Sequence, residues 1–233
     1  MNIREKFDWG SHIPLNKSLL EIFDVSGVVE LGIGHYSTGT FIDSGVKKLL
    51  SIETDKSWIE NIIKKYPEDD DHKYFYHETF DVLRGTPRWK VPKQTHEKNI
   101  SLYKSLNTSE YNFLFVDNIA SLRRDALEIL HNKFDIVVFH DTQDHYPNRP
   151  KVRQGSVNHS YVNDPDLGTF KPGSDYAYIQ DKSIPTNTSC LIRKNLMNKF
   201  YDLVEIHIRN MNAFISECLE NNPGFSPKLE ILM

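Results

Sequence analysis

A short apolar run that ends in two closely spaced glycines constrains the fold of this chain more than any other feature. The segment from Val28 reads VVELGIGHYS, so Gly32 and Gly34 stand where a buried strand would end and a turn begin. Glycine lets the backbone approach a ligand closely, and the amides of such a turn can donate hydrogen bonds to a carboxylate or a phosphate. The pattern therefore predicts a strand that leads into a ligand-binding turn.

Two acidic residues narrow the class of ligand. Glu30 stands two residues before Gly32, and Ser37 occupies the place of the third glycine of the dinucleotide-binding motif. A carboxylate at Glu30 suits a ligand with ammonium and sulfonium groups better than a pyrophosphate, which it would repel. Glu53, at the end of the next apolar run, can accept hydrogen bonds from both hydroxyls of a ribose. That geometry is shared by NAD and by adenosyl ligands.

Short apolar runs alternate with stretches of helical periodicity, which is the pattern of an α/β fold with a doubly wound, mostly parallel sheet. Most runs are nearly continuous in apolar residues, as expected of strands that are buried on both faces. The predicted strands are Gly27 to Leu31, Lys48 to Ile52, Tyr74 to His77, Phe113 to Val116, Ile136 to Phe139, Tyr176 to Gln180 and Ser189 to Arg193. The predicted helices are Asn16 to Phe23, Lys56 to Lys65, Ile100 to Leu106, Ser121 to Asn132 and Leu196 to about Asn221, with a loop from Arg84 to Lys98.

We expect a single domain, because 233 residues lie within the usual size of one α/β unit. Residues 1–25 would form an N-terminal cap, residues 143–173 an irregular insertion after the fifth strand, and residues 196–221 a C-terminal helix. The spacing of apolar residues in that helix suits either packing on the sheet or a dimer seam. The oligomeric state therefore stays open.

Four segments in this order, ELGIGHYSTG, SIETD, FLFVDN and FDIVVFHDT, resemble the motifs of class I S-adenosylmethionine-dependent methyltransferases. The resemblance extends from about Trp9 to Arg193, and its first motif is the most specific. It implies a Rossmann-like sheet of seven strands whose last strand is antiparallel, with Ser189 to Arg193 in that place. The sequence departs from the family after His140, where a long irregular insertion replaces the usual helix, so substrate contacts cannot be carried over.

The resemblance also implies how S-adenosylmethionine would be held. The glycine turn would surround the methionine part, Glu53 the ribose, and Glu78 or Phe80 the adenine. The full set of predicted cofactor-binding residues is Glu30, Gly32, Gly34, Ser37, Thr38, Glu53, Thr54, Glu78, Asp117 and Asn118. Trp58 either flanks the adenine or packs in the core.

Polar residues that follow the fourth and fifth predicted strands are the candidates for chemistry. Ligands of doubly wound sheets bind at the carboxyl ends of the strands, where Asp117, Asn118, His140 and Asp141 would emerge. Methyl transfer from a sulfonium is an in-line displacement, so the protein must mainly hold the acceptor and remove or offset its proton. His140 suits a general base because the reference pKa of histidine lies near neutrality.

Three roles remain open for these residues. His140 or Asp141 could be a metal-free base, or the group could be purely structural. Alternatively, Asp117 and Asp141 would be hard oxygen ligands of Mg²⁺ or Ca²⁺, which would lower the pKa of a bound hydroxyl. The resemblance to metal-dependent methyltransferases of the catechol and macrocin types makes this metal site worth testing.

The acceptor is the least constrained part of the prediction. The insertion and the earlier loop hold basic and aromatic side chains, among them Arg88, Trp89, Arg149 and Tyr161, which suit an anionic or sugar-like acceptor or form a solvated face. A net charge of −4 and the lack of a continuous basic stripe argue against nucleic acid. The leading hypothesis is an O-methyltransferase of a small-molecule or glycan acceptor. The alternatives are an NAD-dependent oxidoreductase and a non-catalytic S-adenosylmethionine-binding module.

The expected location is the cytoplasm. Cys190 and Cys218 are too few for a disulfide scaffold and form no Cys-x-x-Cys pair, which fits a reducing compartment. The first residues, up to His12, lack the apolar core of a signal peptide, and no apolar run approaches the ~20 residues needed to cross a bilayer. His12 itself either helps to cover the cofactor or lies on the surface.

Overall fold

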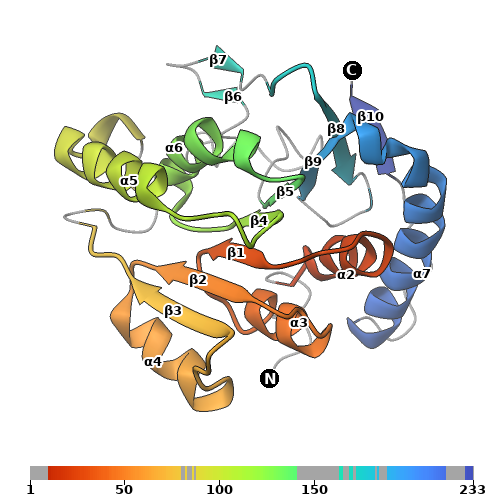
Figure 1. The fold of residues 1–233 in the computed structure, drawn as a ribbon, viewed down its shortest axis with the longest axis horizontal. Coiled ribbons are helices and arrows are strands. Elements are labelled where there is room, and N and C mark those ends of the chain that lie inside the picture. The colour runs from red at the N-terminus through yellow and green to blue at the C-terminus, as the bar shows by residue number, and fades with distance from the viewer. Residues whose placement is uncertain are drawn as a thin grey trace, which may run out of the picture.

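The computed structural model describes residues 10–79, 82, 86, 88–140, 163–164, 168–169, 172–181, 183, 188–218 and 229–232. The strands of its main sheet are β1 (Val28–Leu31), β2 (Leu49–Glu53), β3 (His72–Tyr76), β4 (Phe113–Val116), β5 (Ile136–Phe139), β8 (Tyr176–Asp181), β9 (Ser189–Arg193) and β10 (Leu229–Leu232). They lie in the order β10, β8, β9, β5, β4, β1, β2, β3 (Figure 1). Strands β1 to β5 are mutually parallel, whereas β9 runs antiparallel to both of its neighbours, β5 and β8.

The seven predicted strands are confirmed, each end to within two residues, and β9 is the antiparallel strand that the resemblance implied. An eighth strand, β10, was not predicted. It pairs antiparallel with β8 at the edge of the sheet. Its four residues are too few to be told from a loop by periodicity. Two further strands of two residues each, β6 (Asn163–Asp164) and β7 (Gly168–Thr169), pair within the segment predicted to be irregular.

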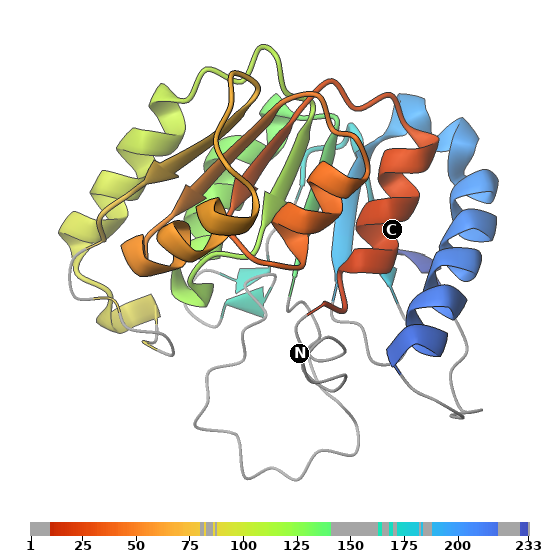
Figure 2. The same cartoon turned by 90° about the horizontal axis from the view of Figure 1, so that it is seen from below.

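Helices cover both faces of the sheet, as expected of a doubly wound fold (Figures 1 and 2). One face carries α2 (Ile13–Ile22), α3 (Ser37–Asp43), α4 (Lys56–Lys65) and α7 (Phe200–Cys218). The other face carries α5 (Lys93–Ser105) and α6 (Ala120–Leu130). Among the described residues, no helix is both long enough and apolar enough to cross a membrane.

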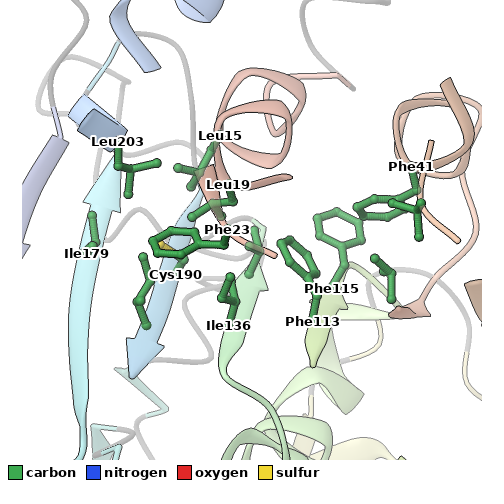
Figure 3. Close-up of a cluster of buried hydrophobic side chains, with 14 of the residues drawn as sticks. Leu15, Leu19, Phe23, Phe41, Phe113, Phe115, Ile136, Ile179, Cys190 and Leu203 are labelled. Atoms are coloured by element: carbon green, nitrogen blue, oxygen red, sulfur yellow. The ribbon is translucent and has the colours of Figure 1, made fainter. Parts of the chain in front are cut away.

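Alternate side chains of the strands form the two halves of the core. On the α2 face, Leu15, Leu19 and Phe23 pack over Phe113 and Ile136 of the sheet (Figure 3). The opposite half contains Leu114, Val116, Val137, Leu127 and Leu130. Because successive residues of a strand point to opposite faces, both faces must be apolar, which explains the nearly continuous apolar runs in the sequence.

Helix α5 begins seven residues earlier than predicted, so the predicted loop from Arg84 to Lys98 is wrong in its last part. The residues that α5 buries are Thr95, Asn99 and Tyr103. Their polarity hides the apolar periodicity by which a helix is usually found. Pro92 stands directly before the first helical residue, where the missing N–H of proline costs nothing.

The other helix boundaries shift less. Helix α2 begins at Ile13, three residues before the predicted start. The C-terminal helix α7 begins at Phe200, after a 3₁₀ segment over Lys194–Lys199, and its predicted end lies outside the described residues.

Candidate functional site

A single row of residues crosses the sheet at the carboxyl ends of its parallel strands. The pairing register places Gly32 opposite Glu53 on one side and opposite Asp117 on the other. It continues through His140 and on into the hairpin of β8 and β9. We call these six residues the edge row: Glu53, Gly32, Asp117, His140, Thr188 and Asp181. By strand alternation they share the α2 face, and the row spans the point between β1 and β4 where ligands of doubly wound sheets bind.

Gly32 has no room for a side chain. Its φ is 90°, and a Cβ atom would lie 2.5 Å from the backbone of Asp117. A left-handed conformation and this close approach each require glycine. The turn after β1 therefore packs directly on the end of β4.

The carboxylate of Glu53 joins β2 to the glycine turn. Its Oε2 accepts a hydrogen bond from the amide of Ile33 at 3.0 Å, and its Oε1 accepts from the amides of Thr54 at 2.6 Å and Asp55 at 3.0 Å. Burial raises the pKa of Glu53, and these backbone donors act against that rise. Because each carboxylate oxygen can accept more than one hydrogen bond, Oε2 keeps the capacity to bind a hydroxyl group.

Trp58, on α4, contacts the same turn. Its indole N–H donates to the carbonyl of Ile33, and its ring meets His35 edge-on with the ring centroids 5.6 Å apart. The sequence left open whether Trp58 flanks the adenine or packs in the core. In the structure it is 40% exposed and holds the backbone of the glycine turn.

Glu30 lies fully buried beneath the turn. Its Oε2 accepts hydrogen bonds from the hydroxyls of Thr38 at 2.9 Å and Ser51 at 2.6 Å. Burial raises the pKa of Glu30 from 4.5 to about 7, although hydrogen bonds from Ser37, Ser51 and Thr38 lower it in part. In this structure Glu30 links β1 to β2 and to the start of α3, and its contact with the methionine part stays a prediction.

Beyond β4 and β5, three side chains form a hydrogen-bonded chain. The Oγ of Ser11 lies 2.8 Å from Nε2 of His140, and Nδ1 of His140 lies 3.3 Å from Oδ1 of Asp117. In the tautomer whose Nδ1–H donates to Asp117, Nε2 is a hydrogen-bond acceptor that faces Ser11. Arg123 supports the chain from behind, since it donates to Oδ1 of Asp117 at 2.5 Å and to the carbonyl of His140 at 3.0 Å.

His12 belongs to the same cluster. Its ring lies 5.2 Å from that of His140 and 5.0 Å from that of Phe115, and it is only 2% exposed, so a surface position is wrong. Ligand atoms of His12, Asp117 and His140 all lie within 4.8 Å of one another, a grouping that could hold a metal ion. Two imidazoles with one carboxylate suit Zn²⁺ or Fe²⁺ better than the predicted Mg²⁺ or Ca²⁺. The second predicted ligand, Asp141, lies outside the described residues.

The predicted adenine side is only partly described. Asn118 donates through Nδ2 to the hydroxyl of Tyr103 at 3.1 Å. Glu78 is exposed and lies 3.5 Å from the ammonium group of Lys98. Phe80 lies outside the described residues.

Arg88, one of the basic residues considered for the acceptor, has partners within the fold. It donates to Asp125 at 2.6 Å and to the carbonyl of Ser121 at 3.1 Å, both on α6. Trp89 beside it is 64% exposed. The predicted acceptor residues of the insertion, such as Arg149 and Tyr161, lie outside the described residues.

Sequence reasoning missed Ser11 and Arg123 as members of the site. Arg123 follows Asp117 by six residues, and this spacing, one turn into a helix that starts after a strand, was the available signal. Ser11 stands 129 residues before His140, so nothing local in the sequence joins them.

No protein-family model and no curated protein sequence matches this chain. Among solved structures, a Staphylococcus aureus protein provisionally named a caffeoyl-CoA O-methyltransferase matches with a TM-score of 0.53 and 13% identity, over 83% of this chain and 92% of that chain. An O-methyltransferase family protein from Burkholderia thailandensis matches with a TM-score of 0.48 and 10% identity, over 82% of this chain and 56% of that chain. The N-methyltransferase NodS from Bradyrhizobium japonicum WM9, in complex with S-adenosyl-L-homocysteine, gives 0.47 and 11%, over 78% and 85%.

The sheet order and the first of these matches identify the fold as that of class I S-adenosylmethionine-dependent methyltransferases. At 13% identity the likeness establishes the fold alone, and the reaction has to be inferred from the residues of the site.

Proposed function

We propose that this protein is an S-adenosylmethionine-dependent methyltransferase that methylates an oxygen atom of a small-molecule or sugar-like acceptor. The observation that carries the proposal is the 3.0 Å hydrogen bond from the amide of Ile33 to the carboxylate of Glu53. It joins the turn predicted to hold the methionine part to the carboxylate predicted to hold the ribose. The class I fold supports the same function.

The residues present fit this cofactor. Gly32 carries no side chain and has a φ of 90°, so the backbone of the turn after β1 can approach a ligand closely. Oε2 of Glu53 keeps hydrogen-bonding capacity for a ribose hydroxyl. Oδ1 of Asn118 is buried and has no hydrogen-bond partner among the described residues, so it is suited to accept from the amino group of adenine. A pyrophosphate fits less well, because Glu30 lies directly beneath the turn.

When bound, S-adenosylmethionine supplies a methyl group on a positively charged sulfur, and the carbon–sulfur bond breaks as the acceptor oxygen bonds to that carbon. His140 takes up the proton of the acceptor hydroxyl at Nε2, with the Ser11 hydroxyl, 2.8 Å away, as the relay. Asp117 accepts the Nδ1–H bond and stabilises the imidazolium that forms. Arg123 fixes the carboxylate of Asp117 for that task. Asp141 stays the second candidate for the base.

A metal-assisted route would use the same cluster differently. His12, Asp117 and His140 would be ligands, and His140 could then no longer act as the base. Arg123 already neutralises Asp117 through a 2.5 Å ion pair, which disfavours a dication there. The metal-free route is therefore the one we propose, and chelation distinguishes the two.

We also propose that the protein acts in the cytoplasm. Cys190 and Cys218 are both buried and form no disulfide, as expected of a protein in a reducing compartment.

Isothermal titration calorimetry with S-adenosylmethionine, S-adenosylhomocysteine and NAD tests the proposal. We expect both adenosyl ligands to bind and NAD to give no signal. Glu53→Gln should weaken S-adenosylhomocysteine binding ~10-fold or more, because it exchanges a charged acceptor for a weaker one. Glu97→Gln, on an exposed face of α5, is the matched control and should bind like the wild type. Binding of NAD alone would refute the proposal, and binding without methyl transfer to any acceptor would leave a non-catalytic module.

A further inference from the structure

The edge row continues past His140 into a buried polar region. Thr188 and Asp181, its last two residues, have no exposed surface. On α7, His207 is fully buried and faces Asp181, and on α2, which packs against α7, Asn16 is fully buried too. Since neighbouring strands lie ~4.8 Å apart, Asp181 stands ~10 Å along the row from His140. The polar region thus extends sideways from the proposed reaction site, away from the cofactor.

The polarity of this region is confined to the edge of the sheet. On β4, β5, β9 and β8, the residues directly before the edge row on the same face are Phe115, Val138, Cys190 and Ile179, all of them buried and apolar. On each of these four neighbouring strands, the next residue on the same face is polar. The apolar core therefore ends abruptly at the edge row.

Several of these buried polar atoms have unused hydrogen-bonding capacity. Among the described residues, neither Nδ2 nor Oδ1 of Asn16 has a hydrogen-bond partner, and neither does Oγ1 of Thr188 or Nδ1 of His207. Buried polar groups in native proteins are nearly always paired, and an unpaired one lowers stability. A ligand that pairs with these four atoms would explain why the fold buries them without partners.

The acidic side chain of the region, Asp181, already faces a basic one, His207. Nε2 of His207 lies 3.2 Å from Oδ2 of Asp181, and Oδ1 of Asp181 accepts from the amide of Ser183 at 2.8 Å. An ionic ligand would bury its charge here without a counter-ion among the described residues. Hydroxyl groups can both donate and accept, so they match the amide of Asn16 and the hydroxyl of Thr188 without adding charge.

We infer that the acceptor of the proposed methyl transfer is a neutral, polyhydroxylated compound of about the size of one sugar unit. One hydroxyl reacts beside His140, and the others bind Asn16, Thr188 and His207. This inference rests on the proposed function and narrows its substrate class. Because the binding atoms have no exposed surface here, the segments that cover them must part when the acceptor enters.

Two acceptor panels test the inference, with the formation of S-adenosylhomocysteine as the readout. One contains methyl glycosides and a cyclitol, and the other contains the phenols catechol and caffeate. We expect methyl transfer to the hydroxylated panel, and Thr188→Val and Asn16→Leu should each raise the KM for those acceptors ~10-fold. The affinity for S-adenosylhomocysteine should not change. Thr108→Val, a partly buried threonine before β4, is the matched control and should leave the KM unchanged.

Thermal unfolding gives a readout that needs no acceptor. Because the Thr188 hydroxyl has no partner, Thr188→Val should keep the Tm or raise it by ~2–4 °C, whereas loss of a structural hydrogen bond would lower it. A lowered Tm, transfer to phenols alone, no transfer to any hydroxylated compound, or an unchanged KM in both variants would each overturn the inference. Failure of the wild type to bind S-adenosylhomocysteine would instead refute the proposed function.

Discussion

The two ends of the edge row treat their polar groups in opposite ways. At the β2 end, the Glu53 carboxylate is partly buried and receives hydrogen bonds from the amides of Ile33, Thr54 and Asp55. At the β8 end, Asn16 and Thr188 are fully buried, yet their side-chain polar atoms have no hydrogen-bond partner among the described residues. We therefore propose that the hydrogen bonds of the β2 end are complete before a ligand arrives, and that a ligand completes those of the β8 end.

This difference indicates which part of the edge row lowers the stability of the free protein. Preorganised backbone donors at the cofactor end hold a carboxylate in place at little cost. Unpaired groups at the β8 end, where we propose that the acceptor binds, lower the stability of the free protein, as is common where a site is shaped for a ligand. Four predictions test this difference between the two ends. The first concerns His140, which lies between them.

The largest effect should come from His140→Gln. Loss of the general base should lower kcat ~10²–10⁴-fold, because the acceptor hydroxyl then keeps its proton in the transition state. The affinity for S-adenosylhomocysteine should stay within twofold, since His140 lies between the two ends and belongs to neither. Steady-state kinetics and calorimetry measure the two quantities. His72→Gln, at the start of β3, is the control, and an equal loss of cofactor affinity in His140→Gln would contradict the assignment.

Gly32→Ala should disrupt the turn after β1 at the β2 end of the row. The new Cβ would lie 2.5 Å from the backbone of Asp117, at a φ of 90°, so we expect a loss of ~3–5 kcal/mol in stability and no detectable binding of S-adenosylhomocysteine. Gly45→Ala is a matched control, because its φ is 73° but no atom lies within 4 Å of the added Cβ. It should lose only the ~1–2 kcal/mol of a left-handed conformation. Urea denaturation of both variants separates the steric effect from the conformational one, and equal losses would argue against the close contact.

Glu30→Gln should change how the stability of the protein depends on pH. Burial raises the pKa of Glu30 from 4.5 to about 7, so between these values the folded state keeps a proton that the unfolded state has released. Wild-type stability should therefore fall by ~2–3 kcal/mol as the pH rises from about 4.5 through 7. The variant lacks this proton, so its stability relative to the wild type should rise over the same window. Urea denaturation at pH 5 and pH 8 measures the change, and a constant difference would show that Glu30 titrates like an exposed carboxyl group.

The smallest effect should come from removing metal ions. We expect EDTA to change turnover by less than a factor of two, because Arg123 rather than a metal ion neutralises Asp117. If EDTA abolishes turnover and Zn²⁺ or Mg²⁺ restores it, the metal-assisted route is correct. His12→Ala then identifies the site, since it would prevent that restoration only if His12 is a ligand.

The arrangement of the residues at the β2 end of the row was easier to predict from the sequence than the arrangement at the β8 end. Glu30, Gly32 and Glu53 lie in one continuous strand, helix, strand segment, so their spacing along the chain carries the geometry. The seven core strands were predictable for a similar reason, because burial on both faces leaves a strong apolar run.

The remaining features depend on contacts that no local pattern encodes. Ser11 and His12 join His140 from the start of α2, 129 residues away in the case of Ser11. The sequence predicts only that Asn16 begins a helix, and its complete burial depends on how α2 packs against the sheet and against α7 from the other end of the chain. Helix α5 was missed in part because its buried side chains are polar.

The indole N–H of Trp58 donates a hydrogen bond to the carbonyl of Ile33, so the fluorescence of Trp58 can report on the glycine turn. Indole emission responds to the polarity around the ring and to hydrogen bonding at its N–H, so a ligand that shifts the turn will shift the fluorescence of Trp58. The chain has three tryptophans, and the other two are Trp9 and Trp89. Replacing those two with phenylalanine leaves a single indole that can follow ligand binding in real time, without a label and before any acceptor has been found.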